Sequence, residues 1–551
     1  MKPLRLYAVF ACIVGAYATL GIRLYEIQIL QGSFYSARAE SQYRLAGFFE
    51  PSRGLITLTD KRGMQTPAAA NVPERVVFSV SREIKDIDAA VENLSPILDI
   101  EAGSLRTMLG KKGAYRVILK GPTDEQVRKI SEAGIAGIHV DTSDKRSYPL
   151  GSLASQVIGF VGPGGSDDKI QGRYGAEKAF EATLAGTPGS DDGETVGESL
   201  QGTDIALTLD ISVQKEAETI LKRLIEEKKA TGGSIIVEEP ATGKVIAMAS
   251  APDFNPNEYG KHPLEAFINP TVQSRYEPGS VMKVLTASIG LDTRAFTPQT
   301  TYYDTGKLVF PDGKVVKNWD LKAHGLMTMT NVIEESLNIG AAFMQKKIGN
   351  KPFYDYLLKF GLNDPTGIEL PGEVSGNLKN IKTHTADIDF AAASFGQGVA
   401  ITPIQLISAV GAIANGGNLM KPYITSDGGP HAVRRVLSPD AARQTVDMMV
   451  SAVDKAKVAH IDGFTVAGKT GTAQAVDFVH GGYTKDVINT YVGFSPAYAP
   501  RFIILIKLDK PAGAPLAGTT VVPAFRELAK FVLDYYDVPP DALKPEPEET
   551  Q

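Results

Sequence analysis

Cysteine is almost absent from the 551-residue chain: Cys12 is the only one, so an intrachain disulfide is excluded. The seven histidines show no metal-ligand spacing, and we expect neither a metal nor a cofactor. A net charge of −6 gives no reason to expect nucleic acid as a partner. The run Gly468-Lys469-Thr470 lacks the upstream glycines of a phosphate-binding loop. These absences point to chemistry carried by ordinary side chains.

Long hydrophobic runs are also scarce, and the only one lies over residues 6–22, behind Lys2 and Arg5. Its length is at the short end of the roughly 17 to 25 residues that span a bilayer as a helix. Positive charge before it favours a cytoplasmic N-terminus. The alternative is a cleaved signal peptide, because Ala16-Tyr17-Ala18 has the form of a cleavage site. Apolar character continues beyond that site, so we predict that residues 1–30 are a cytoplasmic tip and an uncleaved transmembrane anchor, with the rest extracytoplasmic.

Residues 31–203 mix short helix and strand patterns and contain no titratable cluster. Among them we expect a helix over 87–98 and a strand over 154–162. Glycine and acidic residues become dense between 162 and 202, which marks a boundary. We therefore predict a mixed α/β pedestal over 31–203 for dimerisation or partner docking. At the other end, residues 539–551 are rich in proline and glutamate and are predicted to be a disordered tail.

The region 204–538 begins and ends with strand patterns around a helix-rich middle over 280–417. The expected strands and helices outside that middle cover residues 204–209, 211–228, 233–238, 243–250, 465–473, 491–494, 502–508 and 523–536. Strands on both sides of an all-helical insert predict one sheet with a helical subdomain beside it. The fold class is therefore α+β.

A serine and a lysine stand one helical turn apart at the start of the helix-rich middle. Ser280 follows a Pro-Gly pair, and Lys283 lies three residues further along an apolar run. Residues three apart on a helix share a face, so the lysine amine can serve as the base that activates the serine hydroxyl. The alternative is a helix-capping serine followed by a surface lysine. An S-x-x-K pattern occurs by chance in many chains of this length, so the pair carries little weight alone.

Two further elements contain polar residues at short spacing. Ser336 and Asn338 can converge on one point if they lie in a short loop between helices, the alternative being an ordinary helix surface. Lys469, Thr470 and Thr472 lie in a strand pattern interrupted by glycines, which often mark a close approach by backbone or ligand. Strand alternation places the two threonines on one face, where they would meet a substrate carboxylate, and Lys469 on the other.

Taken in order, Ser280-x-x-Lys283, Ser336-x-Asn338 and Lys469-Thr470-Gly471 resemble the signature of penicillin-binding proteins and class A β-lactamases. The rest of the chain resembles the class B penicillin-binding proteins, of the FtsI-like division type. The elements that carry this resemblance are Arg53-Gly54-x-Ile56 with Asp60 and Gly63, which has two extra residues before its Asp; Gly172-Arg173-Tyr174-Gly175-Ala176-Glu177; Glu277-Pro278-Gly279; and Phe395-Gly396-Gln397-Gly398. No glycosyltransferase domain is recognisable upstream of residue 204, which favours class B over the bifunctional class A.

The resemblance implies a serine acyltransferase fold of the penicillin-binding and β-lactamase type over 204–538. It implies that Ser280 attacks the penultimate D-Ala carbonyl of a peptidoglycan stem peptide while a neutral Lys283 takes its proton. It makes Ser336 the relay to the leaving amine, and Asn338 the residue that holds Lys283 or the peptide amide.

The strand that carries Lys469 has implied roles as well. Lys469 would depress the pKa of Lys283, and Thr470, Gly471 and Thr472 would bind substrate. Backbone N–H groups of Ser280 and Thr472 would receive the oxyanion. The implied function is D,D-transpeptidation during septal wall synthesis, with covalent binding of β-lactams.

Several alternatives stay open at this point. D,D-carboxypeptidation and β-lactam hydrolysis use the same acyl-enzyme, although Glu334 and Glu335 fit an exposed helix turn better than a deacylating base. An elongation-type transpeptidase, a β-lactam sensor, or a largely structural activator of a membrane glycosyltransferase would share much of the sequence. From the resemblance we expect a glycosyltransferase of the FtsW/RodA type and other divisome proteins as partners.

Overall fold

The computed structural model describes residues 51–81, 83–110, 116–164, 169–187, 200–383, 386–476 and 482–542, with scattered positions between 14 and 25. Most of the predicted anchor over 1–30 and most of the predicted tail over 539–551 lie outside these residues. Among these described residues, none of the helices combines the length and the apolar character of a membrane span.

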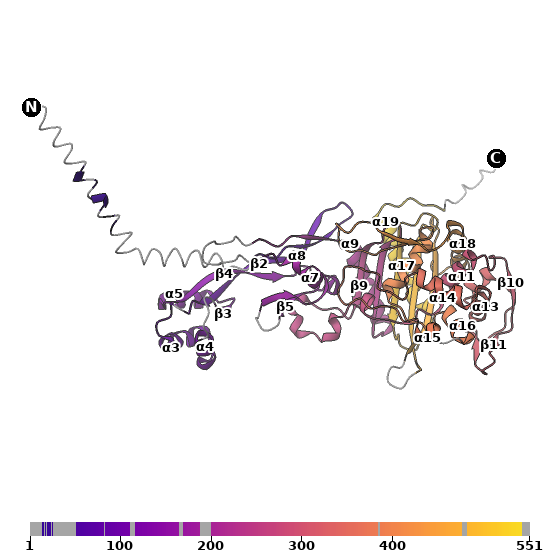
Figure 1. Cartoon of the computed structure of the whole chain (residues 1–551), viewed down its shortest axis with the longest axis horizontal. Coiled ribbons are helices and arrows are strands. Elements are labelled where there is room, and N and C mark those ends of the chain that lie inside the picture. The colour runs from indigo at the N-terminus through magenta and orange to yellow at the C-terminus, as the bar shows by residue number, and fades with distance from the viewer. Residues whose placement is uncertain are drawn as a thin grey trace, which may run out of the picture. The chain divides into compact units, whose positions relative to one another are not determined.

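The chain forms two compact units (Figure 1). The smaller unit contains Met1–Gly54, Asn71–Arg146 and Ala182–Thr203. The larger unit contains Leu55–Ala70, Ser147–Glu181 and Asp204–Gln551. Residues 55–70 and 147–181 therefore pack with the region that carries the motifs.

In the part of the chain that the structure describes, the smaller unit combines strands of one sheet with helices that pack on it. The latter part of β2 (Gln65–Ser79) pairs with β3 (Arg116–Lys120) and β4 (Ile138–Ser147). The helices are α3 (Ile87–Leu98), α4 (Ala102–Gly110) and α5 (Asp124–Ala133). The predicted helix over 87–98 is confirmed, because its apolar residues recur on one face and Asp86 caps its first N–H groups. Apolar residues of the sheet and the helices form one core.

A five-stranded antiparallel sheet is the centre of the larger unit, in the order β16-β17-β18-β8-β9. Its strands are β16 (Ala467–Val476), β17 (Tyr483–Ser495), β18 (Phe502–Asp509), β8 (Gly232–Glu239) and β9 (Lys244–Ala251). Seven of the eight residues of β8 and of β18 are buried, so both faces of the sheet are covered. The terminal helices α9 (Ile211–Lys228) and α19 (Val521–Tyr535) share one core with the sheet. The predicted sheet is confirmed.

The helical subdomain packs on one face of the sheet and carries the Ser280 and Ser336 motifs. Its main helices are α11 (Met282–Asp292), α12 (Met329–Glu334), α13 (Asn338–Ile348), α14 (Asn350–Lys359), α16 (Asp387–Ser394), α17 (Pro403–Ala414) and α18 (Pro439–Ala456). Helix α17 packs on β8 and β18, and α18 packs on β16 and α11. All twelve residues of α17 and the first ten of α11 are buried, so this subdomain is a second hydrophobic core.

Two expectations from the sequence are wrong. The middle is not all helical, because β10 (Thr301–Asp304), β11 (Lys307–Val309), β12 (Val315–Lys317) and β13 (Gly325–Thr328) form two small antiparallel ribbons within it. The expected strand over 154–162 contains the short helix α6 (Ser155–Ile158) and then β5 (Val161–Gly164). A short apolar run does not distinguish a buried strand from a buried helical turn, and tertiary packing decides.

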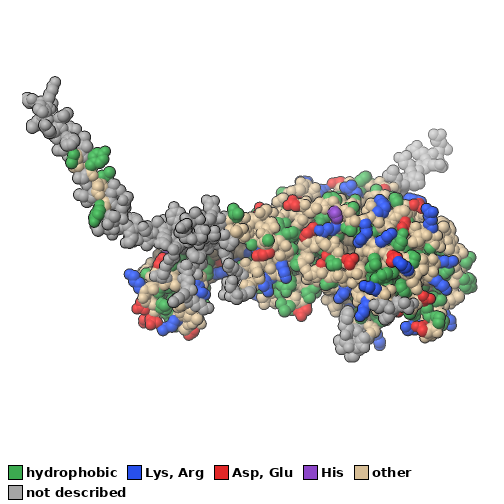
Figure 2. Space-filling model, in the orientation of Figure 1, with side chains coloured by type: hydrophobic (Ala, Val, Ile, Leu, Met, Phe, Trp, Pro, Cys, Tyr) green, Lys and Arg blue, Asp and Glu red, His purple; other side chains and the backbone are tan. Residues whose placement is uncertain are grey.

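Other short elements complete the larger unit. Strand β1 (Ile56–Thr59) pairs with the first residues of β2 and, in parallel, with β7 (Ile205–Asp210). The segment after β4 is held by aromatic packing, with the ring of Phe160 stacked on Tyr259 at 4.4 Å between centroids. On the face shown in Figure 2, lysine and arginine alternate with aspartate and glutamate, without a large area of one sign.

Among the described residues, one buried carboxyl in this core has an oxygen without a hydrogen bond. Glu238 on β8 is 1 % exposed, and its Oε2 atom has no hydrogen bond. It lies beside α17, where a Cβ on Gly411 would stand 3.5 Å from its Oε1. Burial raises the pKa of this carboxyl to about 8. The group is therefore protonated in the folded chain at neutral pH.

We predict that Glu238→Gln raises the free energy of unfolding above that of the wild type, and that this difference is larger at pH 8 than at pH 5. The folded state keeps this proton up to about pH 8, whereas the unfolded chain releases it near the ordinary value of 4.5. The wild-type free energy of unfolding therefore falls as the pH rises between these values. At pH 8 the gain from the substitution should be on the order of a few kcal/mol, since each pKa unit is worth about 1.4 kcal/mol.

Denaturant unfolding at several pH values measures this difference. Glu226→Gln on the exposed side of α9 is the matched control and should change little. Equal effects of the two substitutions across the pH range would contradict the prediction.

Candidate functional site

Ser280 lies in a single helical turn directly before α11. The turn η5 covers Gly279–Val281. Gly279 has a left-handed φ of +57°, a conformation that glycine adopts without steric cost. Ser280 is the only partly exposed residue in the otherwise buried run from Tyr276 to Leu291. The local fold thus presents one hydroxyl at the surface of a packed core.

Lys283 lies in the first turn of α11, and its side chain is fully buried. Its Nζ is 3.0 Å from Ser280 Oγ. The same nitrogen is 2.5 Å from the Ser336 carbonyl oxygen, 3.2 Å from Ser336 Oγ and 2.8 Å from Asn338 Oδ1. Every one of these partners is a neutral oxygen.

The loop between α12 and α13 contains Ser336, and Asn338 follows directly after this loop. Ser336 has a left-handed φ of +57°. Asn338 is the first residue of α13, and its Nδ2 donates to the Lys317 carbonyl oxygen at 2.9 Å. That bond turns its Oδ1 toward Lys283. The two residues therefore converge on the lysine amine, Ser336 from the short loop and Asn338 from the start of α13.

Lys469 approaches the same point from strand β16, and its side chain is also buried. Its Nζ donates to Ser336 Oγ at 2.9 Å, and Thr470 O and Thr470 Oγ1 lie at 3.2 and 3.3 Å. The Ser336 hydroxyl therefore lies between the two lysine amines. A serine one turn from a lysine is joined here by a second lysine from a distant part of the chain.

Burial is the main influence on both amines. It lowers the pKa of Lys283 well below the ordinary lysine value, and the charge of nearby Lys469 lowers it further. Burial alone lowers the pKa of Lys469 to about 7. A buried amine without a carboxylate partner loses its proton readily. Lys283 is therefore suited to accept a proton from Ser280 at neutral pH.

Strand β16 is an edge strand, and its edge lies against the Ser280 turn. A Cβ on Gly471 would stand 2.6 Å from the Pro278 carbonyl oxygen, so only glycine permits this approach. Thr470 and Thr472 are partly exposed beside it. Thr472 Oγ1 accepts a hydrogen bond from Ala517 N at 3.2 Å, while the Thr470 hydroxyl faces Lys469.

Two carboxylates beside Ser336 are directed away from it. Lys455 on α18 pairs with Glu334 at 3.0 Å and with Glu335 at 2.6 Å. Glu334 also accepts a hydrogen bond from Ser451. In the part of the chain that the structure describes, neither glutamate has a hydrogen bond to Ser280.

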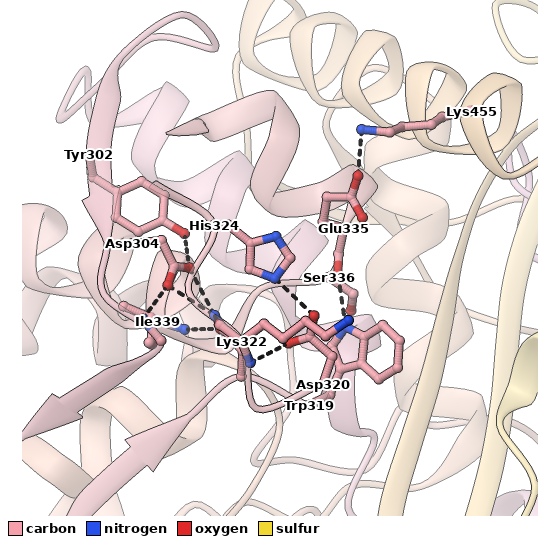
Figure 3. A network of polar contacts seen from close by, with 12 residues as sticks. Tyr302, Asp304, Trp319, Asp320, Lys322, His324, Glu335, Ser336, Ile339 and Lys455 are labelled. Atoms are coloured by element: carbon pink, nitrogen blue, oxygen red, sulfur yellow. Dashed lines mark hydrogen bonds and ion pairs between the residues drawn. The ribbon is translucent and has the colours of Figure 1, made fainter. Parts of the chain in front are cut away.

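Two structural supports around the Ser280 site were not predicted from the sequence. The Glu277 carboxylate accepts hydrogen bonds from Gly398 N at 2.9 Å and from the Tyr483 hydroxyl at 3.0 and 3.1 Å. Burial raises the pKa of Glu277. The second is a polar network from the β10–β13 segment that contacts the Ser336 loop (Figure 3). Thr-Tyr-Tyr before Asp304 and Pro-Asp-Gly over 311–313 were the available strand and turn signals.

Comparison with known proteins agrees with this arrangement. A family model described as penicillin binding protein transpeptidase domain matches residues 233–530. The chain belongs to the penicillin-binding protein transpeptidase family. A second model, the penicillin-binding protein dimerisation domain, matches residues 49–202. The resemblance to class B penicillin-binding proteins is confirmed.

Relatives of this penicillin-binding protein align with nearly all of its sequence. Stage V sporulation protein D of Bacillus subtilis is 29% identical over 553 residues, covering 94% of this chain and 83% of that protein. Peptidoglycan D,D-transpeptidase FtsI of Escherichia coli K12 is 29% identical over 554 residues, covering 97% and 92%. The crystal structure of a peptidoglycan synthetase from Bifidobacterium adolescentis has a TM-score of 0.70 at 24% identity, covering 90% of this chain and 98% of that one, and shares the fold.

We predict that Gly471→Ala slows covalent labelling of Ser280 by a fluorescent penicillin at least about tenfold, because small displacements of reacting groups are costly. The added methyl group would push β16 away from the Pro278 carbonyl and the Ser280 turn. Labelling kinetics on folded protein measure the effect. Gly518→Ala, where a Cβ meets nothing within 4 Å, is the matched control. Equal labelling rates for the two variants would contradict the account of Gly471.

Proposed function

We propose that this penicillin-binding protein is a peptidoglycan D,D-transpeptidase whose acyl-enzyme forms on Ser280. The observation that carries the proposal is the contact between the Ser280 hydroxyl and the buried Lys283 amine, which has no carboxylate partner among the described residues. The similarity to FtsI, which is named for this activity, supports the same reaction. The substrate would be a stem peptide that ends in D-Ala-D-Ala.

The arrangement around Lys283 explains how it can act as a base. A neutral amine has two N–H donors and one lone pair. The two shortest contacts, to the Ser336 carbonyl and Asn338 Oδ1, account for both donors. The lone pair is then left for the Ser280 hydroxyl proton at 3.0 Å between heavy atoms. Ser280 loses this proton to Lys283 as its Oγ attacks the penultimate D-Ala carbonyl.

Charge that develops on the substrate oxygen needs donors, and the backbone N–H groups of Ser280 and Thr472 are our candidates. A single such donor supplies roughly 3 to 4 kcal/mol of transition-state stabilisation. Ser336 lies within hydrogen-bond distance of both lysines and is placed to pass the proton to the leaving D-Ala amine. Lys469 with the hydroxyls of Thr470 and Thr472 would bind the terminal carboxylate of the substrate.

The second half-reaction transfers the acyl group to an amine of a neighbouring stem peptide. Hydrolysis would need a base that activates water at the acyl-enzyme. Glu334 and Glu335 are held by Lys455 instead. This favours transfer over rapid hydrolysis, and it makes the adduct with a β-lactam long-lived. A carboxypeptidase or a β-lactamase fits these contacts less well.

We predict that penicillin forms a covalent adduct on Ser280 and that Ser280→Ala abolishes it. Intact-mass and peptide mass spectrometry of protein treated with a labelled penicillin measure the adduct and its position. Ser274→Ala, a partly exposed serine shortly before the site, is the control and should retain labelling. Wild-type protein without an adduct on Ser280 would refute the catalytic proposal.

We propose a division role and the domain assignments on the same basis. Similarity to FtsI and the dimerisation-domain match over 49–202 support a pedestal over 31–203 that docks divisome partners and a glycosyltransferase of the FtsW/RodA type. Residues 1–30 would anchor the transpeptidase domain, over 204–538, on the extracytoplasmic side of the membrane. A fluorescent fusion should gather at midcell in dividing cells. An even sidewall distribution would favour the elongation role.

A further inference from the structure

A fully buried aspartate, Asp304, belongs to the polar network beside the Ser336 loop (Figure 3). Asp304 ends strand β10 and has no exposed surface. Its carboxylate accepts hydrogen bonds from the Tyr302 hydroxyl at 2.9 Å and from Gly306 N at 2.7 Å. Asn318 Nδ2 lies 3.0 and 2.9 Å from its two oxygens. A buried carboxylate held only by neutral donors is costly unless each bond is kept.

Asn318 connects this aspartate to the Ser336 loop and the start of α13. While its Nδ2 faces Asp304 and the Lys322 carbonyl, its Oδ1 accepts from Ile339 N at 3.2 Å. The side-chain amide thus has one defined orientation, because only the donor end can face the carboxylate. The acceptor end is left for the first turn of α13, next to Asn338.

The neighbours of Asn318 contact the same loop on either side. The Lys317 carbonyl accepts from Asn338 Nδ2 at 2.9 Å, and Trp319 Nε1 donates to the Glu335 carbonyl at 3.0 Å. Residues 317–319, called the loop clamp below, therefore reach residues 335–339 at three points. The described contacts of Asp304 fix the middle residue of this clamp.

The conformation of the Ser336 loop and of Asn338 depends on such contacts. Ser336 is not glycine, and a left-handed conformation costs such a residue roughly 1 to 2 kcal/mol. Strained backbone of this kind persists only where the surroundings over-determine it. The Asn338 amide also has two possible orientations, and only one presents Oδ1 to Lys283. The Lys317 carbonyl selects that orientation.

We propose that Asp304 is a positioning residue for acylation, which acts through Asn318 and the loop clamp on Ser336 and Asn338. It touches neither the substrate nor Ser280. By fixing the loop clamp, Asp304 maintains the hydrogen bond between Asn338 Oδ1 and the Lys283 amine. The lone pair of that amine then points at the Ser280 hydroxyl. The inference rests on the proposed function, since it concerns the same Lys283 base.

The test compares Asp304→Asn and Asn318→Ala with wild type in acylation by a fluorescent penicillin. Stopped-flow kinetics separate the affinity of the non-covalent complex from the rate constant for bond formation. We expect that rate constant to fall at least about tenfold in both variants, with little change in affinity, because misplaced catalytic groups slow chemistry more than binding. We also expect the midpoint of its pH dependence to move, since Lys283 loses an oriented acceptor.

Asp320→Asn is the matched control. This aspartate lies in the same segment and pairs with His324 at 3.0 Å and with Lys322 N at 3.1 Å, outside the loop clamp. It should keep the wild-type rate constant and midpoint. The proposal is overturned if Asp304→Asn and Asn318→Ala retain both wild-type values, or if Asp320→Asn loses as much as they do.

Thermal melting accompanies each variant. If Asp304→Asn does not fold, Asn318→Ala alone decides, by the same rate constant and midpoint. Failure of the wild-type protein to form an adduct on Ser280 would reject the proposed function. An acylated wild type with unaffected variants would reject only the role of Asp304.

Discussion

Burial of two lysine amines, for which the described residues provide no carboxylate partner, is the constraint on which the site depends. An ammonium group is costly to remove from water, and the cost is avoided when the group gives up its proton. Among the described residues, the hydrogen-bond partners of Lys283 Nζ are oxygens of Ser280, Ser336 and Asn338, and the charge of Lys469 disfavours its protonation further. A carboxylate in the same place would stabilise the ammonium and remove the base. The core around α11 thus creates a base from a residue that is ordinarily a cation.

The rest of the larger unit keeps this desolvated pair in register with Ser280. The helical subdomain supplies the nucleophile turn and the Ser336 loop, while the sheet edge supplies Lys469. Gly471 lets the sheet edge come within contact distance of Pro278, and Gly279 lets the chain turn sharply before Ser280. The β10–β13 segment holds the loop from outside. None of these supports is chemically reactive, yet each sets a distance that the proton transfer requires.

Sequence patterns predicted the elements whose information is local. The helix over 87–98 and the sheet strands follow from periodicity and caps, and the motif residues follow from their order. What failed depends on tertiary contacts. The strands β10–β13 have only three or four residues each, so their strand and turn signals are weak. Residues 155–158 form a helical turn because packing overrides their strand-like composition. Asn338 is oriented by the backbone carbonyl of Lys317. Because every residue has such a carbonyl, the residue type at position 317 does not predict this contact.

The central claim is that Lys283 is uncharged at neutral pH in the folded protein. An NMR titration of protein labelled with ¹³C at lysine Cε, with the Lys283 signal assigned from its loss in Lys283→Gln, measures this directly. The account predicts a Lys283 midpoint well below the ordinary lysine value of about 10.4 and an uncharged amine at pH 7. A Lys283 signal that titrates with the surface lysines near that ordinary value would contradict it.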